Sequence, residues 1–184
     1  STLKLRRCEV VFIDFGGAVF SYQKHKTRIG TAPYRSPEVL LELPWDEKTD
    51  VWSLGVMLLR LYMGPRPFHA GGRVEHLAQV ERLLGKALPV GLLGRVKASA
   101  SAEGLVRSSA DHGGESGTLR LHEVDAIAAE RVARVRPMVE VVCAADWGFL
   151  DLLRRLLQPE PLERVSAADA SRLDFVADKG PIVE

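Results

Sequence analysis

The segment from Thr49 to Met63 constrains the fold of this chain most, because it is apolar on nearly every side. Thr49 or Asp50 can cap its first turn, and Gly64-Pro65 ends it. In a water-soluble protein, a helix without a polar face has to be surrounded by other elements. The segment therefore predicts a helix at the centre of a bundle. With 184 residues, of which 46% are hydrophobic, the chain can build such a core.

Charge and cysteine content exclude several classes of protein. The 25 Lys+Arg and 24 Asp+Glu leave a net charge of +1, which gives no electrostatic case for nucleic acid or a membrane surface as main partner. No apolar run approaches the roughly 18–20 residues of a membrane helix. Two cysteines, Cys8 and Cys143, are too few for a disulfide framework or a zinc site. We expect a reduced intracellular chain, and its start at Ser1 suggests that residues precede it.

Helical patterns occupy most of the chain after its first third. We expect short or full helices at 38–43, 49–63, 74–84, 123–135, from 138, 149–157 and 166–173. Gly85 lies just past the third of these, as a helix-ending glycine does. The expected organisation is one domain, with a turn and a long loop in 1–38, a helical core in 39–93, a flexible insertion rich in Ser, Ala and Gly in 94–122, C-terminal helices in 123–176 and a tail in 177–184.

A possible metal ligand follows the first apolar run. Residues 8–13 are β-branched and apolar, which predicts a buried strand, and Asp14-Phe15-Gly16 ends it. A carboxylate at the end of a strand, followed by a glycine that lets the backbone turn, can hold a divalent cation against phosphate oxygens. In the alternative interpretation, Asp14 only bonds the amides of its own turn. Residues 18–37 are polar and show no periodic apolar pattern, which predicts a long loop. Loops of this length without structure of their own usually serve a function.

Three further motifs follow Asp14-Phe15-Gly16 in a fixed order. They are Gly30-Thr31-Ala32-Pro33-Tyr34-Arg35-Ser36-Pro37-Glu38, then Asp50-Val51-Trp52-Ser53-Leu54-Gly55, then Arg164 after Glu160-Pro161. This order resembles the C-terminal lobe of a eukaryotic protein kinase. The resemblance implies a protein-kinase-like fold limited to that lobe, mainly α-helical with a short β remnant, within an α+β complete domain.

A second resemblance narrows the family. Residues 75–85 read Glu-His-Leu-Ala-Gln-Val-Glu-Arg-Leu-Leu-Gly and are similar to Glu-His-Leu-Ala-Met-Met-Glu-Arg-Ile-Leu-Gly, the motif of the LAMMER (CDC-like) dual-specificity kinases. Gln79 and Val80 replace the two methionines. Thr27, Thr31 and Tyr34-Arg35 also fall where the activation segment of that family lies. The alternatives are a neighbouring kinase family, or an ordinary amphipathic helix at 75–82.

The resemblance implies roles in nucleotide binding and phosphorylation for the first motif and the loop. Asp14 would hold the Mg²⁺ that bridges the ATP phosphates, with Phe15 and Gly16 completing the motif. Residues 17–35 would form the activation segment, with Thr27, Ser21 and Tyr22 as candidate phosphate acceptors. Thr31 would face the acceptor hydroxyl, as in Ser/Thr kinases.

The resemblance also implies structural roles. Glu38 and Arg164 would form a buried ion pair that ties the activation segment to the last helices. Asp50 would bond the backbone of the catalytic loop, although a helix cap is equally compatible with its position. For the whole family the resemblance implies ATP and Mg²⁺ as cofactors, a nuclear location and Ser/Arg-rich splicing factors as protein substrates, with no direct nucleic-acid or membrane partner.

The 184 residues lack several parts of a kinase. They contain no His-Arg-Asp, no catalytic-loop asparagine, no glycine-rich loop and no strand lysine paired with a helix glutamate. We therefore expect this chain alone to be inactive. Three interpretations stay open: part of an active Ser/Thr or dual-specificity kinase, a catalytically dead kinase-like module that binds partners, and an unrelated helical interaction domain. Gln79-Val80 and Leu173-Asp174-Phe175, where the family has His-Pro-Phe, keep the second open.

Overall fold

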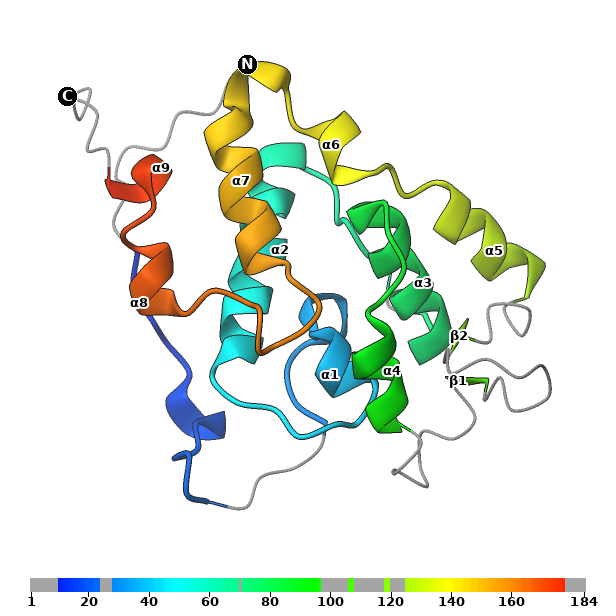
Figure 1. Ribbon diagram of the computed structural model, residues 1–184, viewed down its shortest axis with the longest axis horizontal. Coiled ribbons are helices and arrows are strands. Elements are labelled where there is room, and N and C mark those ends of the chain that lie inside the picture. Colours follow the sequence, from blue (N-terminus) through cyan, green and yellow to red (C-terminus); the bar gives the residue numbers. More distant parts are fainter. Residues whose placement is uncertain are drawn as a thin grey trace.

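The computed structural model describes residues 10–23, 28–69, 71–96, 106–107, 118–119 and 125–177. Helices make up most of this structure, and they pack around one core (Figure 1). The α-helices are α1 Pro37–Leu40, α2 Lys48–Met63, α3 Arg73–Leu84, α4 Val90–Val96, α5 Ala126–Ala133, α6 Met138–Val141, α7 Trp147–Leu156, α8 Ala167–Ala170 and α9 Asp174–Ala177. Short 3₁₀ turns are η1 Phe15–Gly17, η2 Ala32–Tyr34 and η5 Ala144–Asp146.

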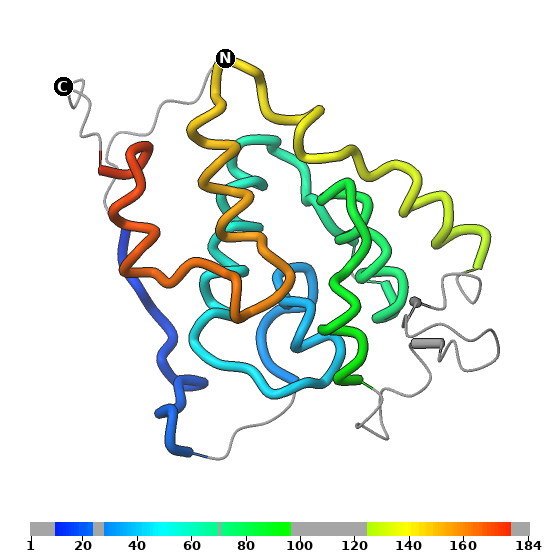
Figure 2. The backbone as a smooth tube through the Cα atoms, viewed as in Figure 1, coloured from blue at the N-terminus to red at the C-terminus, as the bar shows by residue number. Residues whose placement is uncertain are grey.

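Helix α2 lies at the centre of the molecule, as the apolar pattern of Thr49–Met63 predicts (Figure 2). It packs along α7, and its side chains Trp52, Val56 and Leu59 are fully buried. The two helices approach closely at Gly55, where an added Cβ would lie 2.9 Å from Leu157 Cδ2. A side chain at that position would push the helices apart, so the glycine is required by packing.

The expectation that α2 is buried on every side is wrong for one face. Leu54, Met57 and Leu61 on that face are 41%, 42% and 74% exposed. Their spacing of three and four residues places them on one stripe of the helix. Nothing in the described part of the chain covers this stripe. Because α2 is apolar on nearly every side, the face that no described element covers is apolar too.

Helix α3 ends as predicted and is buried more deeply than predicted. Gly85 takes the left-handed conformation, with φ 67°, just past the last residue of the helix. Leu77, Val80 and Leu83 are buried against the core. The opposite side of α3 is covered by α5, which the chain supplies from its second half (Figure 1).

The insertion predicted at 94–122 begins inside a helix that the pattern did not reveal. Helix α4 buries Leu92, Leu93 and Val96. Further along, β1 (Val106–Arg107) and β2 (Thr118–Leu119) pair in antiparallel fashion, with Val106 opposite Leu119. The rest of the predicted insertion, and the predicted tail from 178 onward, lie outside the described residues.

The strand predicted at residues 8–13 is wrong in its described part. Val10 to Ile13 have no strand conformation, and these side chains are 77–82% exposed. A strand forms only when a neighbour accepts and donates its backbone hydrogen bonds. No described strand lies beside these residues, and β1 and β2 lie at the opposite edge of the molecule (Figure 1). In the described ranges, no helix has the length and apolar character needed to span a bilayer.

Candidate functional site

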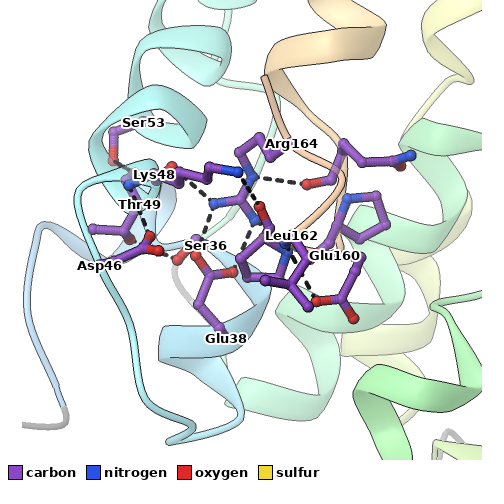
Figure 3. A network of polar contacts seen from close by, with 12 residues as sticks. Ser36, Glu38, Asp46, Lys48, Thr49, Ser53, Glu160, Leu162 and Arg164 are labelled. Atoms are coloured by element: carbon purple, nitrogen blue, oxygen red, sulfur yellow. Dashed lines mark hydrogen bonds and ion pairs between the residues drawn. The ribbon is translucent and has the colours of Figure 1, made fainter. Parts of the chain in front are cut away.

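Arg164 and Glu38 form the best-buried polar contact in the described structure. Arg164 Nη1 lies 2.7 Å from Glu38 Oε1, and Nη2 lies 2.9 Å from Oε2, which is a bidentate pair (Figure 3). The two side chains are 0% and 1% exposed. The pair implied by the kinase resemblance is therefore present, joining residues 126 positions apart.

The guanidinium of Arg164 has an acceptor for every donor. Besides Glu38, Nε donates to the Gln158 carbonyl at 2.8 Å, Nη1 to the Lys48 carbonyl at 2.8 Å and Nη2 to the Pro159 carbonyl at 3.3 Å. Arginine has five N–H donors, and these five contacts use all of them. A buried charge is stable only when it is paired and its remaining donors are satisfied. We call these contacts the Arg164 network.

The Arg164 network joins three parts of the chain. The guanidinium carbon lies 5.2 Å from the ring centroid of Trp52, a cation–π contact with central helix α2. Lys48 Nζ donates to the Pro161 carbonyl at 2.9 Å, and the hydroxyls of Ser36 and Thr49 lie 2.6 Å apart. The start of α1, the start of α2 and the turn after α7 are thereby held together (Figure 3).

The residues just before Glu38 are fixed by further hydrogen bonds. Arg35 Nε donates to the carbonyls of Ile29 and Gly30, each at 3.0 Å. The Tyr34 hydroxyl accepts from Arg60 Nη1, and the Ser53 hydroxyl donates to the Tyr34 carbonyl at 3.0 Å. We call residues 28–38 the anchored segment.

Thr31 is exposed at the start of η2, in the middle of the anchored segment. Its carbonyl accepts from the Tyr34 amide at 2.9 Å, while its hydroxyl makes no capping bond. Gly30 just before it has φ 67°, a conformation that glycine adopts without strain. Thr31 therefore presents a free side chain on a fixed backbone.

The cap predicted for α2 is wrong. The helix begins at Lys48, so Thr49 and Asp50 lie inside its first turn. Asp46 satisfies an amide there instead, since its Oδ1 accepts from Lys48 N at 2.9 Å. Thr49 is buried on Ser36, whereas the Asp50 carboxylate has no hydrogen-bond partner among the described residues. Burial raises the pKa of Asp50.

Asp14, Phe15 and Gly16 lie in the exposed stretch 10–23, away from the anchored segment (Figure 1). Asp14 has φ 63° and ψ 57°, a left-handed conformation that Asp adopts more readily than most residues. Its side chain makes no bond to the turn amides, so that alternative is not observed either. Ser21 and Tyr22 are exposed, and Thr27 lies outside the described residues.

The residues around Asp14 do not by themselves fit a Mg²⁺–ATP site. Mg²⁺ takes octahedral oxygen ligands and is usually shared between carboxylates, substrate phosphates and water. In the described ranges, no group of three or more His, Cys, Asp or Glu could hold a metal ion. Asp14 alone supplies one carboxylate, so a Mg²⁺ site here would need further oxygen ligands from outside the described residues.

Sequence reasoning missed a polar cluster inside the LAMMER-like motif. Glu75, His76 and Gln79 are all buried on α3. Arg131 of α5 binds Glu75 through Nε and Nη2, each at 2.7 Å, and Gln79 Nε2 donates to Glu75 Oε1 at 2.8 Å. The hydrogen bonds from Arg131 hold the pKa of Glu75 below its usual value. The partner lies 56 residues away, beyond any local pattern.

His76 in the same cluster is held neutral. Burial, with a smaller contribution from the positive charge of Arg35, lowers its pKa to about 4. Its ring lies 5.0 Å from the ring of Phe68, and Nε2 has no hydrogen-bond partner in the described structure. A proton on this ring would be a buried charge without a counter-ion on that side.

Comparison with known proteins identifies the family. The protein kinase domain model matches residues 3–176, which is most of the chain. This chain belongs to the protein kinase family. It is 32% identical over 170 residues to the probable serine/threonine-protein kinase clkA of Dictyostelium discoideum, covering 91% of this chain and 17% of that one. It is 28% identical over 174 residues to the dual specificity protein kinase CLK4 of Homo sapiens, covering 93% of this chain and 34% of that one.

A solved structure gives the same result for the fold. The crystal structure of a kinase domain superimposes with a TM-score of 0.78 and 28% sequence identity, covering 89% of this chain and 46% of that one. The chain thus spans less than half of that kinase structure, and 17% and 34% of the length of these two curated relatives. The predicted kinase fold, mainly helical and similar to a C-terminal lobe, and the resemblance to CLK-type kinases are confirmed.

Proposed function

We propose that these residues form the substrate-binding lobe of a LAMMER-type Ser/Thr or dual-specificity kinase, whose complete chain transfers the γ-phosphoryl group of ATP to protein hydroxyls. The observation that carries the proposal is the Arg164 network. It fixes the anchored segment, and with it Thr31, on the helical core. Transfer of a phosphoryl group depends mainly on positioning. A fixed backbone with a free, exposed threonine supplies a place against which an acceptor hydroxyl can be aligned.

Two further residues support this proposal. The carboxylate of Asp50 has a raised pKa and no hydrogen-bond partner in the described structure. A backbone amide from outside the described residues can therefore donate a hydrogen bond to it. Asp14 has a left-handed backbone, a conformation that tends to mark functional positions. When bound, ATP with Mg²⁺ would supply the phosphoryl group and the charge that stabilises its transfer. This chain's residues would orient the acceptor peptide.

The proposal is tested in a longer protein that contains the segment upstream of residue 1. In that protein Asp14→Asn should lower kcat by at least about a hundredfold, because the amide binds a divalent cation poorly. Thr31→Ala should lower turnover on protein substrates while the fold is retained. Asp174→Asn removes an exposed carboxylate on α9 and serves as the matched control. Full activity of the Asp14→Asn protein would contradict the metal role.

The 184-residue chain alone should not transfer phosphate. It contains no candidate for the catalytic aspartate of His-Arg-Asp or for the ATP-binding lysine. Incubation with γ-labelled ATP, Mg²⁺ and a Ser/Arg-rich peptide should give no labelled product above the blank. Labelled peptide formed by the purified chain would overturn this proposal.

The second candidate function is a kinase-like module that binds partners without catalysis. It is favoured by Gln79, which stands where the LAMMER motif has methionine and is fully buried in a hydrogen-bonded cluster. The replacement of methionine by Gln79 is compatible with the kinase fold, and a module that only binds partners requires no active site. Sequencing the transcript upstream distinguishes the two candidates. His-Arg-Asp and a strand lysine there support the enzyme, whereas a stop codon supports the binding module.

The resemblance of residues 75–85 to the LAMMER motif implies Ser/Arg-rich splicing factors as substrates and the nucleus as location. Both are part of the proposal. Phosphorylation of a Ser/Arg-repeat peptide by the longer protein, compared with a Ser/Ala-repeat peptide of the same length, tests the substrate. Imaging of the tagged longer protein in cells tests the location.

A further inference from the structure

A pocket of about 550 Å³ lies between the end of α2, helix α3 and the α5–α6 region. Figure 1 shows α5 and α6 beside α3, on the side of the molecule away from residues 10–23. Four of the residues that line the pocket are arginines, Arg66, Arg131, Arg134 and Arg136. Its size is that of a site for a small ligand or a few peptide residues. We call it the arginine pocket.

The lining of the arginine pocket combines two kinds of side chain. Met63, Leu83, Val135 and Val141 give it apolar walls, together with the two prolines. Arginines come from the loop after α2, from α5 and from the turn that follows α5, and none of the lining residues is Asp or Glu. Because the whole chain carries a net charge of only +1, this gathering of arginines is local.

The arginines differ in how firmly they are already paired. Arg66 is exposed and has no hydrogen-bond or ion-pair partner in the described structure. Arg134 binds the carboxylate of the exposed Glu130. Arg136 lies 3.9 Å from the exposed carboxylate of Glu140, and its Nη2 donates to the Glu140 carbonyl at 2.7 Å. Exposed pairs of this kind contribute only about 0.3–0.5 kcal/mol, so a stronger anion can replace the glutamates. Arg131 is held by Glu75 through Nε and Nη2, which leaves Nη1 without a described partner.

We propose that the arginine pocket binds a phosphorylated serine or threonine side chain of a peptide, with an apolar neighbour of that residue on the pocket walls. A phosphate has three acceptor oxygens and a charge of about −1.5 to −2, so several arginines can share it. A carboxylate has two oxygens and is satisfied by one arginine. The apolar walls favour a peptide over free phosphate, and the net charge of only +1 disfavours nucleic acid.

This site lies apart from Thr31 and Asp14 and does not depend on phosphoryl transfer. None of the lining residues belongs to the anchored segment or to residues 10–23. The lobe would therefore hold an already phosphorylated partner or substrate whether or not the longer protein is an active enzyme. Failure of the kinase proposal and failure of this one are consequently separate results.

The test uses the monomeric fraction of the 184-residue chain and fluorescence anisotropy of labelled nonapeptides. The probes carry phosphoserine between two leucines, serine between two leucines, glutamate between two leucines, or phosphoserine between two glycines. The first should bind at least about tenfold more tightly than each of the others, since it alone uses both the charge and the apolar walls. A labelled single-stranded oligonucleotide is the fifth probe and should bind more weakly than the first peptide.

Variants locate the binding site on the chain. Arg66 and Arg134 are both exposed. The substitutions Arg66→Gln and Arg134→Gln should each weaken binding of the phosphoserine peptide about tenfold. Arg154→Gln removes the same charge from an exposed position on α7 outside the pocket and should leave binding unchanged. Equal affinity for the phosphorylated and unphosphorylated peptides would overturn the proposal. So would an equal loss in Arg154→Gln, or tighter binding of the oligonucleotide.

Discussion

The anchored segment, 28–38, and the stretch 10–23 carry neighbouring kinase motifs, yet they differ in burial and in their contacts with the core. In the anchored segment, Pro33, Ser36, Pro37 and Glu38 are buried. A side chain of α2 donates to its backbone, and a side chain of the turn after α7 binds the Glu38 carboxylate. Every residue of 10–23 is exposed, including four consecutive apolar ones. The difference follows from where the partners of each segment lie.

The anchored segment has its partners within the described chain. Arg164 comes from 126 residues further along, Arg60 from the far part of α2, and both reach it because the core positions α2 and α7 side by side. Residues 10–23 have local contacts, such as the stacked rings of Phe20 and Tyr22. A motif thus acquires a defined environment only where its non-local contacts are present.

The largest expected effect comes from breaking the Arg164 network. Arg164→Ala and Glu38→Ala should each lower the free energy of unfolding by about 3–5 kcal/mol, because each leaves a buried partner uncompensated. Arg164→Ala should cost more than Glu38→Ala, since it also leaves the carbonyls of Lys48, Gln158 and Pro159 without donors. Urea denaturation followed by Trp fluorescence measures both.

An exposed ion pair gives the matched control for this prediction. Arg155 and Asp151 lie 2.8 Å apart one turn along α7, with side chains about half exposed. Arg155→Ala should cost about 0.5 kcal/mol or less. If Arg164→Ala were no more destabilising than Arg155→Ala, the network would not hold the anchored segment in solution.

The second prediction concerns acid. The pKa of His76 is lowered to about 4 in the folded chain, from about 6.5 when unfolded. Above pH 6.5 both states are neutral and His76 has no effect on stability. As the pH falls from 6.5 to 4, only the unfolded state takes up the proton, so folding stability should decrease by about 3 kcal/mol. Below pH 4 the loss is complete.

Arg35 of the anchored segment contributes to this loss of stability, because its positive charge adds to burial in lowering the pKa of His76. Urea midpoints between pH 7 and pH 4 measure the decrease. His76→Gln removes the titrating ring and should flatten this part of the pH profile. The exposed His69→Gln is the matched control. An equally steep profile in His76→Gln would assign the acid sensitivity to other groups, of which Glu75 is the nearest candidate.

The sequence predicted those elements whose signals are local. The apolar run gave α2, Gly85 marked the end of α3, and Ser166 stands before α8, where it accepts from the Asp169 amide. The Glu38–Arg164 pair came from the resemblance to kinases, since no spacing rule connects positions 126 residues apart. For α2 the predicted start lies one residue late: the helix begins at Lys48, whose amide donates to Asp46 Oδ1, so neither Thr49 nor Asp50 caps it.

The parts that sequence reasoning missed depend on tertiary contacts. An apolar run such as Val10–Ile13 has the composition of a strand, but hydrogen-bonding neighbours decide whether it becomes one. Glu75 and Gln79 look like surface residues of an amphipathic helix until α5 covers them and supplies Arg131. The arginine pocket collects residues from positions 62 to 141, and no single stretch of sequence shows that gathering.

A third prediction compares a glycine of the buried core with a glycine of the exposed stretch 10–23. Gly55→Ala would place a methyl group 2.9 Å from Leu157 Cδ2 and 3.0 Å from Leu156 Cβ. Overpacking outweighs the gain in helix propensity, so the net cost should be about 1–2 kcal/mol. At Gly17 an added Cβ would meet nothing within 4 Å, and Gly17→Ala should stay within about 0.5 kcal/mol of the parent. Equal effects in thermal unfolding would contradict the packing of α2 on α7.

The smallest effect on stability is expected for substitution of Phe12. Comparison with a buried phenylalanine tests whether burial, rather than the hydrophobic side chain itself, determines the cost of the substitution. A buried phenylalanine such as Phe68, which is 0% exposed, should cost about 3–5 kcal/mol when changed to Ala. Phe12 is 82% exposed, so Phe12→Ser removes no packing and should change the unfolding free energy by less than about 0.5 kcal/mol.

The same substitution should nevertheless change how the chain associates. Val10–Ile13 and the uncovered stripe Leu54, Met57 and Leu61 on α2 are apolar surfaces in contact with water, and surfaces of this kind promote self-association. Light scattering should show the parent chain forming oligomers as its concentration rises, and Phe12→Ser shifting this onset to higher concentration. A clean monomer for the parent at high concentration would mean that contacts beyond those described cover these residues, and the contrast between 10–23 and the anchored segment would then lose its physical basis.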